Sequence, residues 1–171
     1  MCIGMQAYAQ TYEELVGKAM DAVEADSLYD AEKFFKEALN KEPANMGNSL
    51  LLSNLGTIQR RMGKNKEALE SYTWALNKSP HSVKILLNRA SLYLELDYLE
   101  KAYSDYCNVI DLSPKNKEAL QFRAYIYMRQ RQYNEARNDY RMLLEEEPAN
   151  KTARIGMVMA NQKDGRYKEA F

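Results

Sequence analysis

Apolar residues along the chain fall at helical spacing in stretches of about 14 residues, and a proline follows every second stretch. In the second stretch of each pair, an alanine is followed four residues later by an aromatic residue and twelve residues later by the proline. The alanines are Ala31, Ala68, Ala102 and Ala136, with Ala170 as a further copy. The aromatic residues are Phe35, Tyr72, Tyr106 and Tyr140, and the prolines are Pro43, Pro80, Pro114 and Pro148. The alanines recur after 37 residues and then every 34 residues, a period that predicts an array of helix-turn-helix units.

A small residue also recurs in the first stretch of each pair, at Ala19, Gly56, Ala90 and Ala124. We expect it to face the alanine of the second helix, because two small residues let helix axes approach closely. The proline just past the second helix prevents the helix from continuing. The longer first interval is assigned to three extra residues, Met46, Gly47 and Asn48.

At these residues the chain resembles the tetratricopeptide repeat family. Leu55-Gly56, Tyr93 and Tyr127 match parts of the family's first-helix pattern, whereas Val109 and Leu143 depart from its second-helix pattern. The resemblance implies an all-α, right-handed α-solenoid of antiparallel helix pairs, with four full repeats and a partial fifth. The expected boundaries are an N-terminal extension at 1–11 and repeats at 12–45, 49–82, 83–116, 117–150 and 151–171.

The resemblance further implies a scaffold that binds a protein or peptide in a concave groove lined by the first helices. The groove residues that it implies are Asn54, Thr57, Arg61, Lys84, Asn88, Ser91, Gln121, Tyr125 and Arg129. Further first-helix positions carried over from the family are Val16, Met20, Val23, Glu24, Leu50, Ser53, Arg60, Leu87, Glu95, Phe122 and Met128. For Leu50, Leu87 and Met128 the pattern favours core packing instead, since apolar residues at helical spacing usually lie in a core.

One branch of the family binds the acidic C-terminal tails of heat-shock chaperones through a clamp of lysine, asparagine and arginine side chains. Asn54 and Lys84 match that clamp, but Val16, Met20 and Asn88 do not. We therefore expect no tight binding to such tails.

Composition narrows the remaining function classes. The formal net charge is zero, so no strong bulk field attracts nucleic acid, and no apolar run is long enough to span a bilayer. His81 in a turn cannot form a zinc site alone, and Cys107 is expected to be a small buried core residue. The acidic run Glu145–Glu147 is expected to be a solvated surface. The sequence thus predicts a protein without enzymatic activity, cofactor or metal; the alternatives are a self-assembling structural subunit and the regulatory part of a longer protein.

The two ends of the chain carry separate expectations. Ala7-Tyr8-Ala9 fits the site that signal peptidase cleaves, which predicts cleavage before Gln10 and a location in the bacterial periplasm or cell envelope. A short N-terminal extension on a cytoplasmic protein is the alternative. The sequence stops inside the second helix of repeat five, which suggests either a longer array or a cap formed by the first helix of that repeat. Exposed Ile155, Met157, Val158 and Met159 would then promote self-association.

Overall fold

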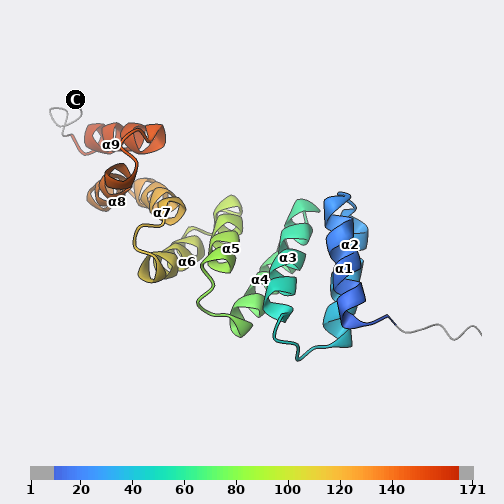
Figure 1. The fold of residues 1–171 in the computed structure, drawn as a ribbon. Helices are drawn as coiled ribbons and strands as arrows, with labels where there is room; N and C mark the ends of the chain where they lie inside the picture. Colours follow the sequence, from blue (N-terminus) through green and yellow to red (C-terminus); the bar gives the residue numbers. More distant parts are fainter. Residues whose placement is uncertain (1–9, 166–171) are drawn as a thin grey trace, which may run out of the picture. The chain divides into compact units, whose positions relative to one another are not determined.

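The computed structural model describes residues 10–165, and Figure 1 shows that helices make up the regular structure of this range. The helices form consecutive antiparallel pairs, which confirms the predicted all-α fold. Their bounds are α1 Tyr12–Glu24, α2 Leu28–Lys41, α3 Asn48–Arg61, α4 Asn65–Lys78, α5 Val83–Glu95, α6 Leu99–Leu112, α7 Lys117–Arg129, α8 Tyr133–Glu146 and α9 Lys151–Lys163. The predicted signal-peptidase site and the start of the last predicted helix lie outside the described residues.

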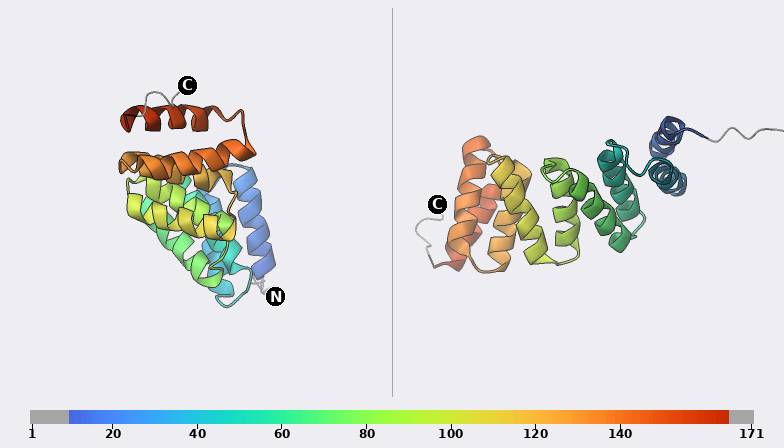
Figure 2. Two further views of the ribbon diagram at one scale, coloured as in Figure 1. Left: turned by 90° about the vertical axis from the view of Figure 1, so that its left-hand side faces the viewer. Right: turned by 90° about the horizontal axis from the view of Figure 1, so that it is seen from below.

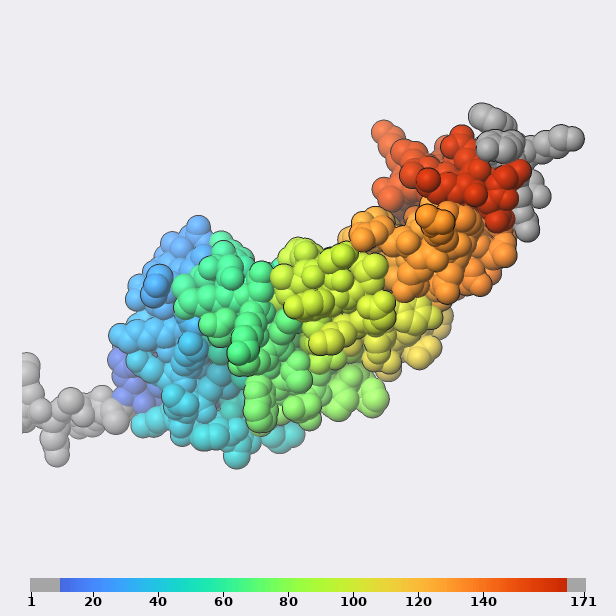
Figure 3. Space-filling view, turned by 180° about the vertical axis from the view of Figure 1, so that it is seen from behind, coloured from blue at the N-terminus to red at the C-terminus, as the bar shows by residue number. Residues whose placement is uncertain are grey.

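The chain divides into two compact units, Met1–Pro80 and His81–Phe171. The first contains α1 to α4 and the second contains α5 to α9. The division falls in the turn after α4, where His81 is exposed to solvent, as the sequence suggested. The space-filling view in Figure 3 shows one face, on which the residues of each unit form a continuous surface.

In the first unit, α1 packs against α2, α3 packs against α4, and α2 also contacts α3. The repeated small residues lie in the core, with Ala19, Ala31 and Ala68 fully buried. Gly56 shows why the position must be small: a Cβ atom there would lie 2.9 Å from the ring of Tyr72 and 3.2 Å from the carbonyl oxygen of Ala68. The close approach of α3 and α4 therefore depends on this glycine.

Two of the three extra residues of the first interval, Met46 and Gly47, lie in the turn before α3, and the third, Asn48, has a structural role of its own. It is the first residue of α3 and is only 1% exposed. Its Nδ2 donates to the carbonyl oxygens of Glu42 at 2.7 Å and Pro43 at 3.1 Å, and its Oδ1 accepts from the hydroxyl of Tyr12 at 3.1 Å. One buried amide thus joins the start of α3 to α1 and to the turn that follows α2.

In the second unit, α5 packs against α6, α7 against α8, and α9 against both α8 and α7. Figure 2 shows α8 and α9 side by side in its left-hand view. Gly156 on α9 lies under the ring of Tyr140, and a Cβ atom at this glycine would come within 2.3 Å of that ring. The aromatic residue of the repeat therefore packs directly onto the backbone of the next helix.

Each first helix ends in the same backbone conformation. The φ angles are positive at Asp26, Gly63, Asp97 and Arg131, with values of 57°, 75°, 60° and 60°. The same repeat position after α9 is Gly165, with a φ of 76°. Asn150 also caps α9 as Asn116 caps α7, each side chain accepting a 2.9 Å hydrogen bond from the third residue of its helix. The residues at both ends of α9 thus match those of a first helix of the repeat.

Candidate binding face of the first helices

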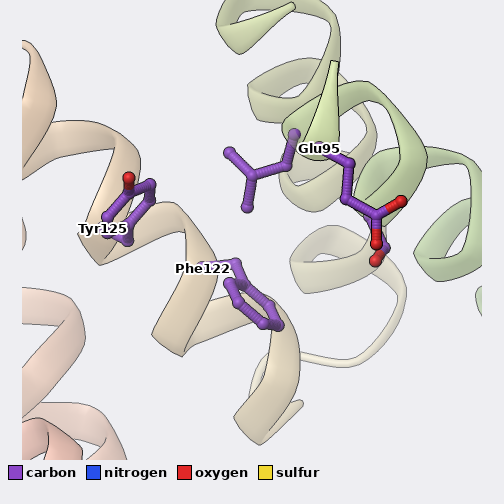
Figure 4. Close-up of a pocket in the computed structure, with 5 residues that line it drawn as sticks. Glu95, Phe122 and Tyr125 are labelled. Carbon is purple, nitrogen blue, oxygen red and sulfur yellow. The ribbon is translucent and has the colours of Figure 1, made fainter. Parts of the chain in front are cut away.

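A pocket lies between α5 and α7 in the second unit (Figure 4). Its volume is about 300 Å³, and the residues that line it are Ser91, Leu94, Glu95, Phe122 and Tyr125. Ser91 and Tyr125 belong to the groove that the sequence predicted, and Glu95 and Phe122 are among the further first-helix positions. Leu94 was missed, although it lies one helical turn after Ser91 and therefore on the same face.

Phe122 is held in place by the core behind it. Its ring stacks on that of Tyr106, with 5.7 Å between centroids and 21° between the ring planes. Tyr106 is the aromatic residue of its repeat and is completely buried. The pocket wall thus rests directly on the repeat core, which restricts the movement of the Phe122 ring.

The side chain of Tyr125 is held by a residue of its own helix, Arg129. Tyr125 is 41% exposed, and its hydroxyl accepts a 3.1 Å hydrogen bond from Arg129. The same guanidinium donates to the carboxylate of Asp97 at 3.1 Å. The hydrogen bond with Tyr125, followed by the bond and charge of Asp97, raises the pKa of Arg129. Arg129, which was predicted to contact a partner, therefore braces Tyr125 and the turn after α5.

The predicted groove residues of the first unit also have contacts within the protein. Thr57 donates to the carbonyl oxygen of Ser53 at 3.1 Å and lies 3.1 Å from the hydroxyl of Tyr72. Arg61 forms an ion pair with Asp26, which repeats the contact of Arg129 with Asp97. Asn54 makes a longer contact, 3.9 Å from its Nδ2 to the sulfur of Met20.

The remaining predicted residues, Lys84, Asn88 and Gln121, lie on α5 and α7 outside the pocket lining. Lys84 is exposed, and the two amide side chains are half-buried. The structure therefore places two of the nine predicted residues in the pocket, Ser91 and Tyr125, and a third, Arg129, directly beside it.

The core predictions for three first-helix residues have different outcomes. Leu87 and Met128 are half-buried, and Met128 packs against the cluster around Tyr140. Leu50 is 55% exposed, so its predicted core packing is wrong. Leu50 occupies the same repeat position as Lys84 and Glu118, which are also exposed, so this position of the first helix faces solvent.

Helix α9 adds apolar surface beside α7. Ile155 and Met159 are 60% and 45% exposed, and they follow Gln121 and Tyr125 by one 34-residue repeat. Met157 and Val158 are half-buried, so the prediction that all four residues are exposed is wrong for these two. Met157 packs against the core cluster that contains Tyr140, because helical spacing directs it toward α8. The exposed pair thus lies at the repeat positions of the predicted groove.

Two buried ion pairs hold the helices that carry the pocket. Arg89 on α5 binds Asp105 on α6 through two hydrogen bonds of 2.8 Å, and Arg123 on α7 binds Asp139 on α8 in the same way. Burial disfavours the charge of Arg89, but Asp105 outweighs it and raises the pKa of the guanidinium. The bonds to Asp139 likewise raise the pKa of Arg123. The sequence analysis did not identify these pairs, although both members recur after 34 residues.

Cys107 is less buried than predicted, whereas Glu145 and Glu146 of the acidic run are exposed, as predicted. Cys107 is half-buried, and Arg123 approaches its sulfur to 3.6 Å, so the cysteine is not a purely apolar core residue. Glu146 forms an ion pair with Lys115 at 2.6 Å, and Glu147 forms one with Lys117. The bond from Lys117 lowers the pKa of Glu147. Glu146 and Glu147 therefore connect the end of α8 to the turn before α7 and to the first residue of α7.

The part of the chain that the structure describes has neither a candidate metal site nor a membrane-spanning helix. No group of three or more histidine, cysteine, aspartate or glutamate side chains there could hold a metal ion. No helix in residues 10–165 has the length and apolar character needed to cross a membrane.

Several solved protein structures are similar to this chain. A crystal structure of a tetratricopeptide repeat protein from Parabacteroides merdae is 44% identical, with a TM-score of 0.89, and the match covers 95% of this chain and 63% of that one. The chain thus spans less than two thirds of that protein's length. The MamA protein is 18% identical with a TM-score of 0.84, over 93% of this chain and 85% of that one, and shows the shared fold.

The first tetratricopeptide domain of Spaghetti (RPAP3), bound to the HSP90 peptide SRMEEVD, is 27% identical with a TM-score of 0.65. That match covers 71% of this chain and 96% of the other. No curated protein sequence matches the chain significantly. A family model described as tetratricopeptide repeat matches residues 53–117 and 123–171. With this match and the repeated helix pairs, the chain belongs to the tetratricopeptide repeat family.

Proposed function

We propose that this protein is a non-enzymatic adaptor that binds a peptide segment of a protein partner on the first helices of its second unit. The pocket between α5 and α7 is the observation that carries the proposal. It lies on the face that the family resemblance implies for ligand binding, and its aromatic walls are held by Tyr106 and Arg129. A wall that is already in place loses little conformational entropy when a ligand binds.

The family supports the same class of function. Tetratricopeptide domains typically mediate protein binding and are generally non-catalytic, and the related RPAP3 domain is bound to a peptide. In the second unit, Phe122 and Tyr125 offer apolar area, and Ile155 and Met159 extend it onto α9. Aromatic residues in such positions often contribute a large share of binding energy.

The side chains around the pocket favour an extended peptide. Asn88 and Gln121 each carry both a donor and an acceptor, which matches the alternating groups of a peptide backbone. An extended segment exposes these backbone groups to the amides while its side chains enter pockets. The amides would therefore bind the backbone, and the pocket would select a side chain.

Partner capture from cell lysates tests the adaptor. The bait is the full chain, compared with a variant that carries Asn88→Ala, Phe122→Ala and Tyr125→Ala. A matched control carries Trp74→Ala and Asn108→Ala, which remove an exposed aromatic and an amide from the second helices α4 and α6. We expect the control to keep the partner and the groove variant to lose it while retaining its helical circular dichroism. Retention of every partner by a folded groove variant would contradict the proposal.

Self-assembly is the competing outcome, because exposed Ile155 and Met159 could contact a second copy. Sedimentation at increasing concentration separates the two functions. The adaptor predicts an unchanged monomer, whereas a structural subunit predicts association that Ile155→Lys with Met159→Lys abolishes. The alternative that these repeats are the regulatory part of a longer protein is compatible with the adaptor function. In that case the bound peptide segment would belong to the same polypeptide.

For the location we propose the bacterial cell envelope, on the basis of the Ala7-Tyr8-Ala9 sequence. Mass spectrometry of the protein from fractionated bacterial cells tests this. A mature N-terminus at Gln10 in the envelope fraction supports it, and an uncleaved chain in the cytoplasmic fraction contradicts it.

A further inference from the structure

In two places, the last residue of a first helix binds an aspartate in the turn that follows the preceding first helix. Arg61 at the end of α3 forms an ion pair with Asp26, which lies after α1. Arg129 at the end of α7 forms one with Asp97, which lies after α5, at 3.1 Å. The fold thus brings these two positions of adjacent repeats together, and an aspartate side chain meets a cation there.

At the end of α9 the same two positions both carry cations. Lys163 follows Arg129 by one 34-residue repeat, and Arg131 follows Asp97 by the same interval. Both cationic side chains are exposed, and within residues 10–165 neither has an ion-pair or hydrogen-bond partner. Two like charges at a place where two other repeats join opposite charges create a local positive potential, which attracts a carboxylate.

An exposed apolar row, Ile155 and Met159, leads to these cations along the same face of α9. The two residues are 60% and 45% exposed, and Met159 precedes Lys163 by about one helical turn. On α7 the position of Met159 belongs to Tyr125, whose hydroxyl accepts a hydrogen bond from Arg129. A thioether is only a weak acceptor, so α9 offers Lys163 no equivalent bond.

The carboxylates nearest in the sequence do not compensate the two cations. Asp164 is next to Lys163, but it binds the buried guanidinium of Arg137 on α8 at 2.9 Å. Glu135, in the first turn of α8, is exposed and forms no ion pair with Arg131 in the described structure. The positive charge of the pair is therefore available to a ligand.

The backbone at Arg131 is a separate indication of function. Its φ is 60°, whereas glycine occupies the equivalent position after α3 and after α9. A long side chain in the left-handed region is strained, and residues with strained backbones are concentrated at functional sites. The folded backbone would be better served by glycine here, so the arginine is a candidate for a role in binding.

We infer that Arg131 and Lys163 together bind an acidic side chain of the peptide, and that the apolar row of α9 contacts a neighbouring apolar residue; this inference rests on the proposed adaptor function. The occupant is an aspartate or glutamate side chain, because the equivalent positions bind aspartate side chains within the protein itself. Charge-assisted hydrogen bonds from the guanidinium and the ammonium would hold the carboxylate. The positions of the chaperone clamp lie on α1, α3 and α5, so this is a separate site.

NMR titration of the isotope-labelled full chain with short peptides tests this inference. The probe is an N-acetylated leucyl-aspartate dipeptide with an amidated C-terminus, and the matched probe has asparagine in place of aspartate. A third probe, the asparagine peptide with a free C-terminus, carries its carboxylate at the chain end instead. We expect saturable shifts at Arg131, Met159 and Lys163. The aspartate probe should bind about fivefold more tightly than the matched probe, since an exposed ion pair contributes modestly, and more tightly than the third.

Variants separate the two contributions. Arg131→Gln with Lys163→Gln should reduce the affinity of the aspartate probe to that of the matched probe. The control, Lys66→Gln with Lys151→Gln, removes the same charge at exposed residues of α4 and the start of α9 and should leave the ratio unchanged. Replacing both residues of the apolar row by alanine should weaken the two amidated probes equally, because both present the same leucine.

Equal affinities for the two amidated probes, shifts confined to other residues, or an unchanged ratio in the Arg131 and Lys163 variant would each overturn the inference. Tighter binding of the third probe would assign the site to a chain end, and concentration-dependent shifts at Lys163 without any probe would assign it to a second copy. Either result also overturns the inference.

The capture experiment separates this failure from that of the adaptor. If the groove variant loses a partner that the Arg131 and Lys163 variant retains at full strength, the adaptor stands and the acidic selection fails. If the probes discriminate but the groove variant keeps every partner, the site is selective and the adaptor function fails.

Discussion

At the scale of single residues, the turns within the repeats show how much the local backbone restricts the sequence. The position after each first helix has a positive φ, which glycine adopts freely and aspartate tolerates. Arg131 occupies it with a φ of 60°. A long side chain in this conformation is strained. Among the turns that follow the first helices, the turn after α7 should therefore have the least favourable backbone energy.

Arg131→Gly should therefore raise the free energy of unfolding by about 0.5–1 kcal/mol, because relief of the strain outweighs the greater freedom of glycine when unfolded. Urea unfolding followed by circular dichroism measures the change. Gly63→Ala is the reverse control and should lower stability by a similar amount, since its φ is 75°. A neutral or destabilising effect of Arg131→Gly would contradict the proposed backbone strain at this position.

Asn48 is the clearest case of a buried polar residue with a structural role. Asn48→Ala leaves the hydroxyl of Tyr12 and the carbonyl oxygens of Glu42 and Pro43 without this partner. We expect a loss of about 2–3 kcal/mol in the free energy of unfolding, since each buried unsatisfied group costs roughly 1–3 kcal/mol. Asn54→Ala, the matched control on the same helix, should change it by less than about 0.5 kcal/mol. Similar losses in the two variants would contradict the assigned role of Asn48.

At the scale of helices, buried ion pairs join α5 to α6 and α7 to α8. Asp105→Ala leaves the guanidinium of Arg89 largely buried without its carboxylate and should cost about 3–5 kcal/mol. The double variant Arg89→Met with Asp105→Leu should recover most of that loss, because buried pairs replaced by apolar residues are often close to neutral. Chemical unfolding of the single and double variants gives the coupling, and additive losses would show that the pair is not coupled.

The first unit contains a different polar network between α2, α3 and α4. Glu32 on α2 is only 5% exposed and binds Lys36 at 2.7 Å and also Lys64. Gln59 lies within 3.5 Å of the same carboxylate and accepts a 2.6 Å hydrogen bond from Ser71. Burial alone would raise the pKa of Glu32, but the two lysines outweigh it and hold the pKa below its ordinary value of 4.5.

This shift has a definite effect on stability. A carboxylate with a lowered pKa in the folded state stabilises the protein above its unfolded pKa, and that stability is lost as pH falls through the folded value. The free energy of unfolding should therefore decrease as pH falls below about 4.5, more steeply for the native chain than for Glu32→Gln. Unfolding curves at several pH values measure both slopes. Parallel slopes would contradict a role for Glu32.

At the scale of the whole molecule, family membership does not identify the partner. The related RPAP3 domain is bound to SRMEEVD, but Val16 and Met20 stand where the chaperone clamp needs a lysine and an asparagine. Both lie on α1, and Met20 is 41% exposed. Calorimetric titration of the full chain with SRMEEVD should show no binding in the low-micromolar range. A dissociation constant in that range would contradict the prediction.

The sequence by itself determined the repeated helix pairs, because alanine, aromatic residue and proline recur at positions where the helix core and helix end require them. Through the family resemblance it also predicted groove positions that include Ser91 and Tyr125, and these two residues line the pocket between α5 and α7. Helical spacing assigns each residue to a side of its own helix, and this information is local.

Only the tertiary structure decided which of those side chains are engaged within the protein. Arg61 and Arg129 had the pattern of groove residues, yet each binds an aspartate that lies in the turn of the preceding repeat. The sequence assigned Asn48 to the extra residues of the first interval, but its buried side chain accepts a hydrogen bond from the hydroxyl of Tyr12. The pocket depends on how closely α5 and α7 approach, and on the stack of Phe122 upon Tyr106. Such contacts join residues far apart in the chain, and they follow from packing geometry that no local pattern specifies.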